Sequence, residues 1–170
     1  MPPDAGLEKA LAVAYRYLNQ RARTEAEMRA RLERIDVDPP DVEQAIAILL
    51  EQGYLDDARF AGLFAQDKRE FDQWGSDRIR QALRARGVPS EFIEDVLAPQ
   101  PGESEAENEI ERALALLRRR FPSPAGDRRE RERALGMLLR KGYDSDLALD
   151  AIAAHARGTT PASSGDRDHL

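Results

Sequence analysis

The sequence predicts an all-α protein in which three tandem three-helix repeats, each similar to a helix-turn-helix, form an elongated, curved molecule. Two general observations support this fold class. Charged residues make up 34% of the 170 residues and aromatic residues only 6%, which is typical of helices and poor in the residues that favour sheets. Apolar residues recur at helical spacing, and capping residues and glycines divide the pattern into short helices.

An internal repeat is the third observation. The segment LRARGV at 83–88 aligns without a gap with LLRKGY at 138–143, and the first repeat departs from the pattern with Asp36 at the glycine position. Small helical units of this kind stack on their neighbours rather than merge into one core. The predicted organisation is a disordered leader (1–6), repeats at 7–53, 54–98 and 104–157, a linker (99–103) and a disordered tail (158–170).

The first repeat is expected to hold three helices. Apolar residues predict a helix from about Leu7 to Arg21, and Thr24 with Glu27 forms a capping box for the second helix. The third helix carries an apolar face and ends at Gly53, a glycine suited to the left-handed conformation that closes helices.

The second and third repeats follow the same order of helices. A helix is expected from Asp57 to about Trp74, where Gly75 stops it, and the next helix ends at Gly87. A short helix then begins at Pro89. In the third repeat, three residues are expected to cap the helices: Ser104, Asp127 and Ser145.

The segment 53–60, here called the corner, joins the first two repeats. Asp56 is placed to cap the following helix, and Leu55 and Phe60 have the spacing of a hydrophobic staple. A helix end and a helix start within a few residues fix the angle between repeats, so the corner is expected to be structural. Its residues are Gly53, Tyr54, Leu55, Asp56, Asp57 and Phe60.

Charge is unevenly distributed along the chain. The net charge is −6, yet residues 118–141 hold nine basic residues and three acidic ones, and residues 88–117 hold one basic residue and eight acidic ones. The third helices of the repeats are acidic, so phosphates would repel them, and reading of DNA bases in the major groove is disfavoured. Basic residues lie on the first and second helices instead, where a continuous basic face would follow a long acidic partner.

This basic face is the predicted binding surface for protein or DNA. In the third repeat the basic residues are the run 118–120 with Arg128, Arg129, Arg131 and Arg133. In the first two repeats the candidate contact residues are Arg16, Arg21, Arg23, Arg29, Arg31, Arg59, Lys68, Arg69, Arg78, Arg80, Arg84 and Arg86.

Catalysis finds little support in the sequence. Cysteine is absent, and the two histidines, His155 and His169, fit a helix C-terminus or solvent rather than a reacting group. Asp56 and Asp57 lack a third metal ligand at helical spacing, and Trp74 is expected in the core. We therefore expect a non-enzyme without cofactor or metal. With no secretory leader or membrane-spanning run, the expected location is the cytoplasm.

Three groups of residues together match a known family: residues 14–18, the corner through Ala61, and Gly75, Ile79 and Leu83 before Gly87-Val88. With these residues the sequence resembles the RecX family of recombination regulators. It covers about residues 7–97 closely and the third repeat in pattern only.

The resemblance implies an all-α regulator, expected to be a monomer, that binds the RecA recombinase and the RecA–DNA filament. It implies restraint of filament growth, ATP hydrolysis and strand exchange, with at most weak, non-specific binding to DNA itself. The alternative, from another class, is a stand-alone, non-specific nucleic-acid-binding repeat protein, which would bind DNA without RecA and lose affinity steeply with salt.

Overall fold

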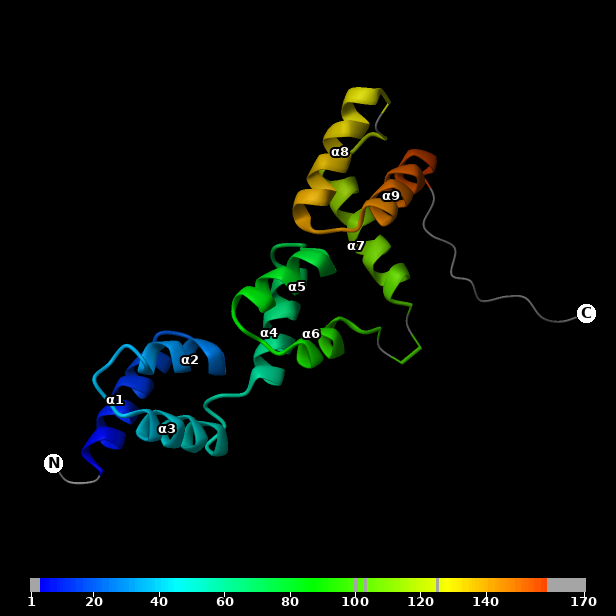
Figure 1. Cartoon of the computed structure of the whole chain (residues 1–170). Coiled ribbons are helices and arrows are strands. Elements are labelled where there is room, and N and C mark those ends of the chain that lie inside the picture. The colour runs from blue at the N-terminus through cyan, green and yellow to red at the C-terminus, as the bar shows by residue number, and fades with distance from the viewer. Residues whose placement is uncertain (1–3, 100, 103, 125, 159–170) are drawn as a thin grey trace, which may run out of the picture. The chain divides into compact units, whose positions relative to one another are not determined.

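The computed structural model describes residues 4–99, 101–102, 104–124 and 126–158, and within these ranges the secondary structure is entirely helical. Figure 1 shows the helices in three successive groups of three. They are α1 (Ala5–Leu18), α2 (Glu25–Leu32), α3 (Pro39–Glu51), α4 (Asp57–Glu70), α5 (Ser76–Ala85), α6 (Ser90–Leu97), α7 (Glu105–Arg120), α8 (Arg128–Lys141) and α9 (Ser145–Arg157).

Two of the hydrophobic cores belong to the first and third repeats. In the first, α1–α3 and the corner bury nine residues: Ala10, Ala14, Met28, Leu32, Val42, Ala45, Ile46, Leu49 and Leu55. In the third, the core contains Ala113, Leu114, Leu117, Leu138, Tyr143, Ala148 and Ala151 among others. The all-α, three-repeat fold class is thus confirmed.

The buried face of the first helix contains alanine in every repeat. Ala10 and Ala14 of α1, Ala61 and Ala65 of α4, and Ala113 of α7 are each at most 1% exposed. Small side chains let helix axes approach closely, because the distance between packed helices depends on the residues at the contact. Each first helix can therefore form a core with two short helices.

Several helix boundaries differ from the predictions. Helix α1 begins at Ala5, inside the expected leader, and ends at Leu18. Helix α4 ends at Glu70 rather than near Trp74, because Gln73 adopts a φ of 53° and the N–H of Trp74 donates to the carbonyl of Lys68 at 3.0 Å. The left-handed conformation at Gln73 breaks the helical hydrogen-bond pattern before the glycine is reached.

Two side chains have roles other than those predicted. The N-cap of α9 is Asp144, which accepts from the N–H groups of Asp146 and Leu147, and Ser145 is the first helical residue. His155 lies in the last turn of α9, as predicted, but it is buried rather than in solvent, with its Nε2 2.9 Å from the carbonyl oxygen of Phe121. It therefore links α9 to the end of α7. His169 lies outside the described residues.

The chain divides into two compact units that cut across the repeats. One unit comprises residues up to Asp67 together with Arg80–Leu97, and the other comprises Lys68–Ile79 together with the chain from Ala98 onward. Helices α4 and α5 each contribute to both units. Within the described ranges, none of the helices has the length and apolar character needed to cross a bilayer.

Candidate partner-binding groove beside the corner

The corner has the local structure that its sequence predicts. Gly53 has a φ of 73°, and the N–H of Arg59 donates to Asp56 Oδ1 at 2.9 Å, as expected for an N-cap and the third helical residue. Leu55 is 2% exposed and joins the core of the first repeat. Tyr54, in contrast, is 55% exposed, so packing in the core does not explain why the corner has a tyrosine at this position.

Asp57 caps a helix of the preceding repeat. Its carboxylate is largely buried, and Oδ1 accepts from the N–H of Glu25, the first residue of α2, at 2.9 Å. Burial raises the pKa of Asp57, and the nearby acidic groups Glu25, Asp56 and Glu27 raise it further, against the opposing effect of the hydrogen bond. Asp57, which the sequence disfavoured as a metal ligand, is therefore a structural hydrogen-bond acceptor between two repeats.

Glu27 and Arg86 form the second connection between α2 and the second repeat. The predicted capping box is present, and Thr24 also donates its hydroxyl to the carbonyl of Arg86 at 2.6 Å. The guanidinium of Arg86 donates to both carboxylate oxygens of Glu27, at 2.9 and 3.2 Å. Burial raises the pKa of Glu27, but the hydrogen bonds from Arg86 and the Thr24 N–H outweigh it and hold the pKa below its usual value.

The end of α5 packs directly on the start of α2. Gly87 has a φ of 76°, and a Cβ at this position would overlap the Cβ of Ala26. Glycine is required here for its conformation and for the close approach. We call this contact among the start of α2, the start of α4 and the end of α5 the first joint.

The second joint repeats this arrangement one repeat later. The N–H of Ser76, the first residue of α5, donates to Glu109 Oε1 at 2.6 Å, as Glu25 donates to Asp57. The N–H of Gly75 donates to the carbonyl of Lys141 at 2.8 Å, and a Cβ on Gly142 would overlap Arg78. Sequence reasoning missed Asp57 and Glu109 as inter-repeat caps, because their partners are backbone N–H groups that any residue supplies.

A groove opens beside the first joint, within the first compact unit. Its volume is about 320 Å³. The structure brings seven of the predicted site residues together around it: Arg21, Arg23, Tyr54, Asp56, Arg59, Phe60 and Arg86. Four further lining residues were not predicted: Ala22, Leu63, Phe64 and Asp67.

The floor of the groove is aromatic and apolar. The rings of Phe60 and Phe64 stack with centroids 6.0 Å apart, and Leu63 is 56% exposed beside them. Tyr54 packs edge-on against Tyr15 at 5.5 Å. Phe60 was predicted as part of the hydrophobic staple of the corner, whereas Leu63 and Phe64 were not among the predicted site residues, although their spacing with Phe60 on one helix face was visible in the sequence. Their exposure leaves an apolar surface of the kind that binds partners.

Arginines surround this floor, and two of them are held by the fold. The guanidinium of Arg86 lies 4.5 Å from the Phe60 ring centroid, and buried Arg23 stacks 3.7 Å from that of Tyr17. Arg21 lies 3.6 Å from Glu27 with half of its side chain exposed. Among the described residues Arg59 has no ion pair, and it is exposed at the groove. Arg21 and Arg59 are thus the cations best placed for a partner.

Outside the groove, acidic third helices neutralise several of the predicted basic residues. Arg29 pairs with Glu43 and Arg80 pairs with Glu94, at equivalent positions of the first two repeats. Arg84 lies 4.0 Å from the same Glu94. The basic face is therefore interrupted by carboxylates, and the acidic third helices have a structural explanation that their sequences did not provide.

The remaining predicted residues are dispersed. Lys68 pairs with Asp72 at 2.7 Å, and Arg78 donates to the carbonyl of Arg140 while stacking on Trp74. Arg69 is half-buried near the end of α4. Arg16 and Arg31 are exposed on α1 and α2. Trp74 is partly exposed rather than a core residue, since it is the surface on which Lys68 and Arg78 lie.

The part of the chain that the structure describes contains no group of three or more histidine, aspartate or glutamate side chains arranged to hold a metal ion.

Comparison with known proteins places every repeat in one family. Residues 10–49, 56–97 and 107–152 match the first, second and third three-helix domains of RecX. The third repeat, which resembled the family in pattern only, is thus matched as well.

Relatives and solved structures agree with this assignment. The regulatory protein RecX of Deinococcus radiodurans is 38% identical over 145 residues, covering 85% of this chain and 67% of the relative. RecX of Trichlorobacter lovleyi is 37% identical, covering 79% and 87%. The crystal structure of RecX from Lactobacillus salivarius superposes with a TM-score of 0.75 at 20% identity, covering 91% of this chain and 98% of that one, which supports the fold. The chain belongs to the RecX family of regulatory proteins.

Proposed function

We propose that this chain is a non-enzymatic regulator that binds the RecA recombinase and the RecA–DNA filament and restrains filament growth, ATP hydrolysis and strand exchange. The observation that carries the proposal is the groove beside the corner, in a chain whose three repeats all match RecX domains. The corner and its continuation, by which the sequence in part resembles the family, supply Tyr54, Arg59 and Phe60 to this groove.

The groove has the composition of a protein-binding site. Tyrosine, phenylalanine and arginine dominate it, and tyrosine and arginine are enriched among residues that contribute most to binding. Its volume of about 320 Å³ suits an apolar side chain or two of a partner segment. With Arg21 and Arg59 at the rim, a segment that carries carboxylates beside its apolar anchor is the best fit.

Binding alone is sufficient for regulation of this kind. A protein that binds filament subunits more tightly in one state than in another shifts the filament towards the favoured state. No reacting group is needed, and the proposed work of the joint is to hold Tyr54 and Arg59 at a fixed orientation. We propose that the chain acts as a monomer in the cytoplasm, where RecA filaments form.

The test is ATP hydrolysis by RecA on single-stranded DNA as the protein is added. We expect inhibition at stoichiometric protein, and we expect Arg59→Glu to raise the half-inhibitory concentration about tenfold, which corresponds to ~1.4 kcal/mol. The matched control is Arg34→Glu, which reverses another exposed arginine that lies outside the groove. Each variant is first checked for an unchanged melting temperature.

Two outcomes would count against the proposal. Unchanged ATP hydrolysis at stoichiometric wild-type protein would remove RecA as the partner. Equal loss of inhibition in Arg59→Glu and Arg34→Glu would show that net charge, rather than the groove, governs binding.

A further inference from the structure

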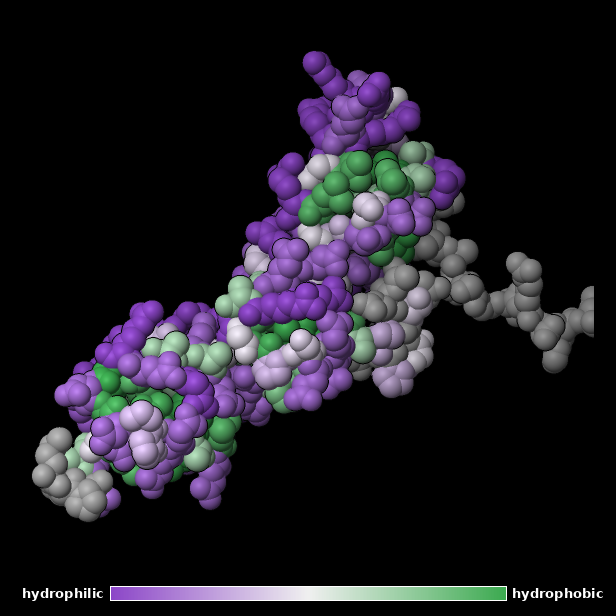
Figure 2. Space-filling model, in the orientation of Figure 1, coloured by the Kyte–Doolittle hydropathy of each residue, from purple (hydrophilic) through white to green (hydrophobic). Residues whose placement is uncertain are grey.

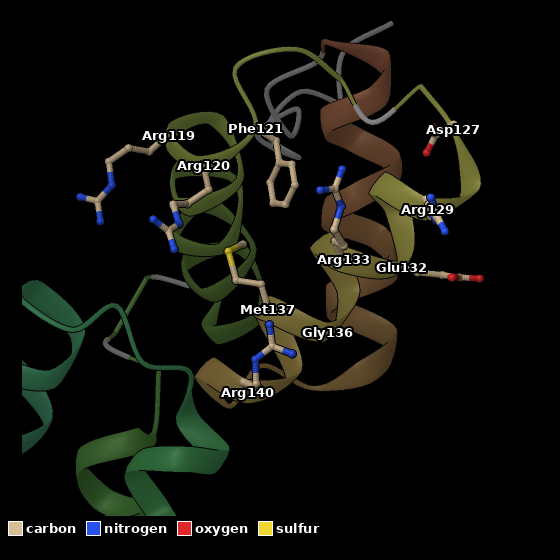
Figure 3. Close-up of a pocket in the computed structure, with 10 residues that line it drawn as sticks. All are labelled: Arg119, Arg120, Phe121, Asp127, Arg129, Glu132, Arg133, Gly136, Met137 and Arg140. Atoms are coloured by element: carbon tan, nitrogen blue, oxygen red, sulfur yellow. The ribbon is translucent and has the colours of Figure 1, made fainter.

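A second site lies in the other compact unit, between the end of α7 and one face of α8. It is a cleft of about 1130 Å³ whose lining includes five arginines: Arg119, Arg120, Arg129, Arg133 and Arg140. Figure 3 shows the lining residues on these two helices and in the connection between them, with Arg120, Met137 and Arg133 around the ring of Phe121. We propose that this cleft binds the backbone of single-stranded nucleic acid.

The positive charge of the cleft is not neutralised by the chain itself. Two acidic residues line it, and both are engaged: Asp127 caps α8 by accepting from the N–H of Glu130, and Glu132 accepts from Arg128 at 2.8 Å. Arg133 lies 4.0 Å from Glu130 with 68% of its side chain exposed. Among the described residues Arg120 and Arg129 have no ion pair. Five guanidinium groups therefore face few competing carboxylates.

Helix stability explains only some of these arginines. Basic residues in the last turn of α7 interact favourably with the negative end of the helix dipole, so Arg119 and Arg120 have that structural explanation. Arg129 lies in the first turn of α8, where the helix dipole disfavours cations, and Arg133 follows one turn later. Figure 2 shows hydrophilic side chains gathered over this end of α8. A charge placed against the helix dipole and left largely unpaired indicates an external anion.

The spacing along α8 suits a repeating anion. Arg129, Arg133 and Arg140 recur at four and seven residues, so they lie on one side of the helix at rises of about 6 and 10 Å. Guanidinium groups bind phosphates through two parallel hydrogen bonds. A row of arginines on a single helix face can therefore follow successive phosphates of one strand.

Apolar groups in the cleft favour a single strand over a duplex or an acidic peptide. Phe121 is only partly buried, and both its ring and the thioether of Met137 line the cleft between the arginines. Single strands expose base faces that stack on aromatic side chains, whereas a duplex keeps its bases stacked inside and a carboxylate side chain has no flat apolar face. Arginines for the backbone and a ring for a base are the two parts of such a site.

The proposal is tested by fluorescence anisotropy of labelled oligothymidylate with the full chain and no RecA present, so its outcome is separate from that of the RecA assay. We expect Arg120→Gln with Arg133→Gln to weaken binding at least tenfold at low salt. The slope of log affinity against log salt should fall by about 1.4, the contribution of two phosphate contacts on a single strand.

The matched control is Arg118→Gln with Arg131→Gln. These arginines lie on the same two helices, are exposed, and do not line the cleft. Both double variants remove two positive charges, so a larger loss in the cleft variant measures position rather than net charge. Phe121→Leu should weaken the binding of oligothymidylate. It should leave the affinity for inorganic polyphosphate, which has no bases, unchanged. Circular dichroism melting of every variant verifies that α7–α9 remain folded.

Three results would overturn the proposal. The two double variants could lose affinity equally, which would remove the cleft as the site. Duplex DNA could bind as tightly as oligothymidylate, which would remove the single-strand preference. Labelled polyglutamate could bind and lose affinity in the Arg120→Gln, Arg133→Gln variant while oligothymidylate binding is unchanged, which would assign the cleft to an acidic protein segment.

Discussion

Two carboxylates at the first joint, buried Asp57 and half-buried Glu27, show how residues of the same charge differ in role. Asp57 has a raised pKa because it is buried near other acidic groups, and its carboxylate accepts from the backbone N–H of Glu25. Glu27 has a lowered pKa because Arg86 and the Thr24 N–H bind its charged form strongly enough to outweigh burial. Asp57 is needed as a hydrogen-bond acceptor for a backbone N–H, whereas Glu27 is needed as a negative charge that binds Arg86.

Substitution of Asp57 should separate these roles. Asp57→Ala leaves the N–H of Glu25 without its acceptor and should lower the free energy of unfolding by about 1–2 kcal/mol, as for loss of other helix caps. Asp57→Asn keeps an acceptor oxygen and removes the unfavourable charge, so it should be at least as stable as wild type. Urea unfolding at neutral pH measures both. Equal destabilisation by the two variants would contradict the assigned role.

Glu27 should give the joint a dependence on acid. Since its pKa is lowered from the ordinary value of 4.5 in the folded protein, its stabilisation is complete above that value and is lost as the pH falls through the lowered folded pKa. Wild type should therefore exceed Glu27→Gln in unfolding free energy by about 1–2 kcal/mol at pH 7. The difference should vanish in stronger acid. A difference that is independent of pH would exclude the charge as its cause.

Helix ends are the elements from which the joints are made. Gly53 and Gly87 both close helices with positive φ, but their surroundings differ. A Cβ on Gly53 would meet open space, whereas a Cβ on Gly87 would overlap Ala26 at the start of α2. One glycine serves only the conformation of its own helix end, and the other also serves contact between two repeats.

Alanine substitution should reveal this difference. Gly53→Ala should lower the unfolding free energy by about 1 kcal/mol, the strain of a left-handed alanine. Gly87→Ala carries the same strain and adds an overpacked contact of about 1–3 kcal/mol. Chemical denaturation of both variants at one pH gives the comparison. Equal losses would mean that α2 and α5 can separate without cost.

At the scale of the whole molecule, the repeats and the compact units do not coincide. The second repeat contributes to both units through α4 and α5, and each unit contains one joint. Asp57 supports the first joint and Glu109 the second, and the two carboxylates share no hydrogen-bond partner. The elongated, curved shape and the predicted domain boundaries stay predictions.

Losses at the two joints should therefore be additive. Asp57→Ala combined with Glu109→Ala should destabilise the chain by the sum of the single effects within about 0.5 kcal/mol, as expected for sites without common partners. Hydrogen exchange should locate the lost protection at the start of α2 for the first variant and at the start of α5 for the second. Loss of protection at both places from one substitution would contradict this independence.

The sequence by itself determined the helices, most of their caps and the glycines that end them. These features depend on residues within one or two turns of each other, as for Thr24 with Glu27 or Asp56 with Arg59. The same local patterns also carried the resemblance to the RecX family and identified the residues of the corner. The predicted ends of α1 and α4 lie three and four residues beyond the observed ends, about one turn, because helix termini are set by weak and competing hydrogen bonds.

Tertiary structure alone decided which groups meet. Asp57 reaches Glu25 across 32 residues and Arg86 reaches Glu27 across 59, and neither spacing leaves a pattern in the sequence. The same folding turned part of the predicted basic face into ion pairs with acidic third helices and left Tyr54 and Arg59 open at a groove. A charge in a sequence shows its sign, but its availability to a partner depends on the neighbours that packing brings to it.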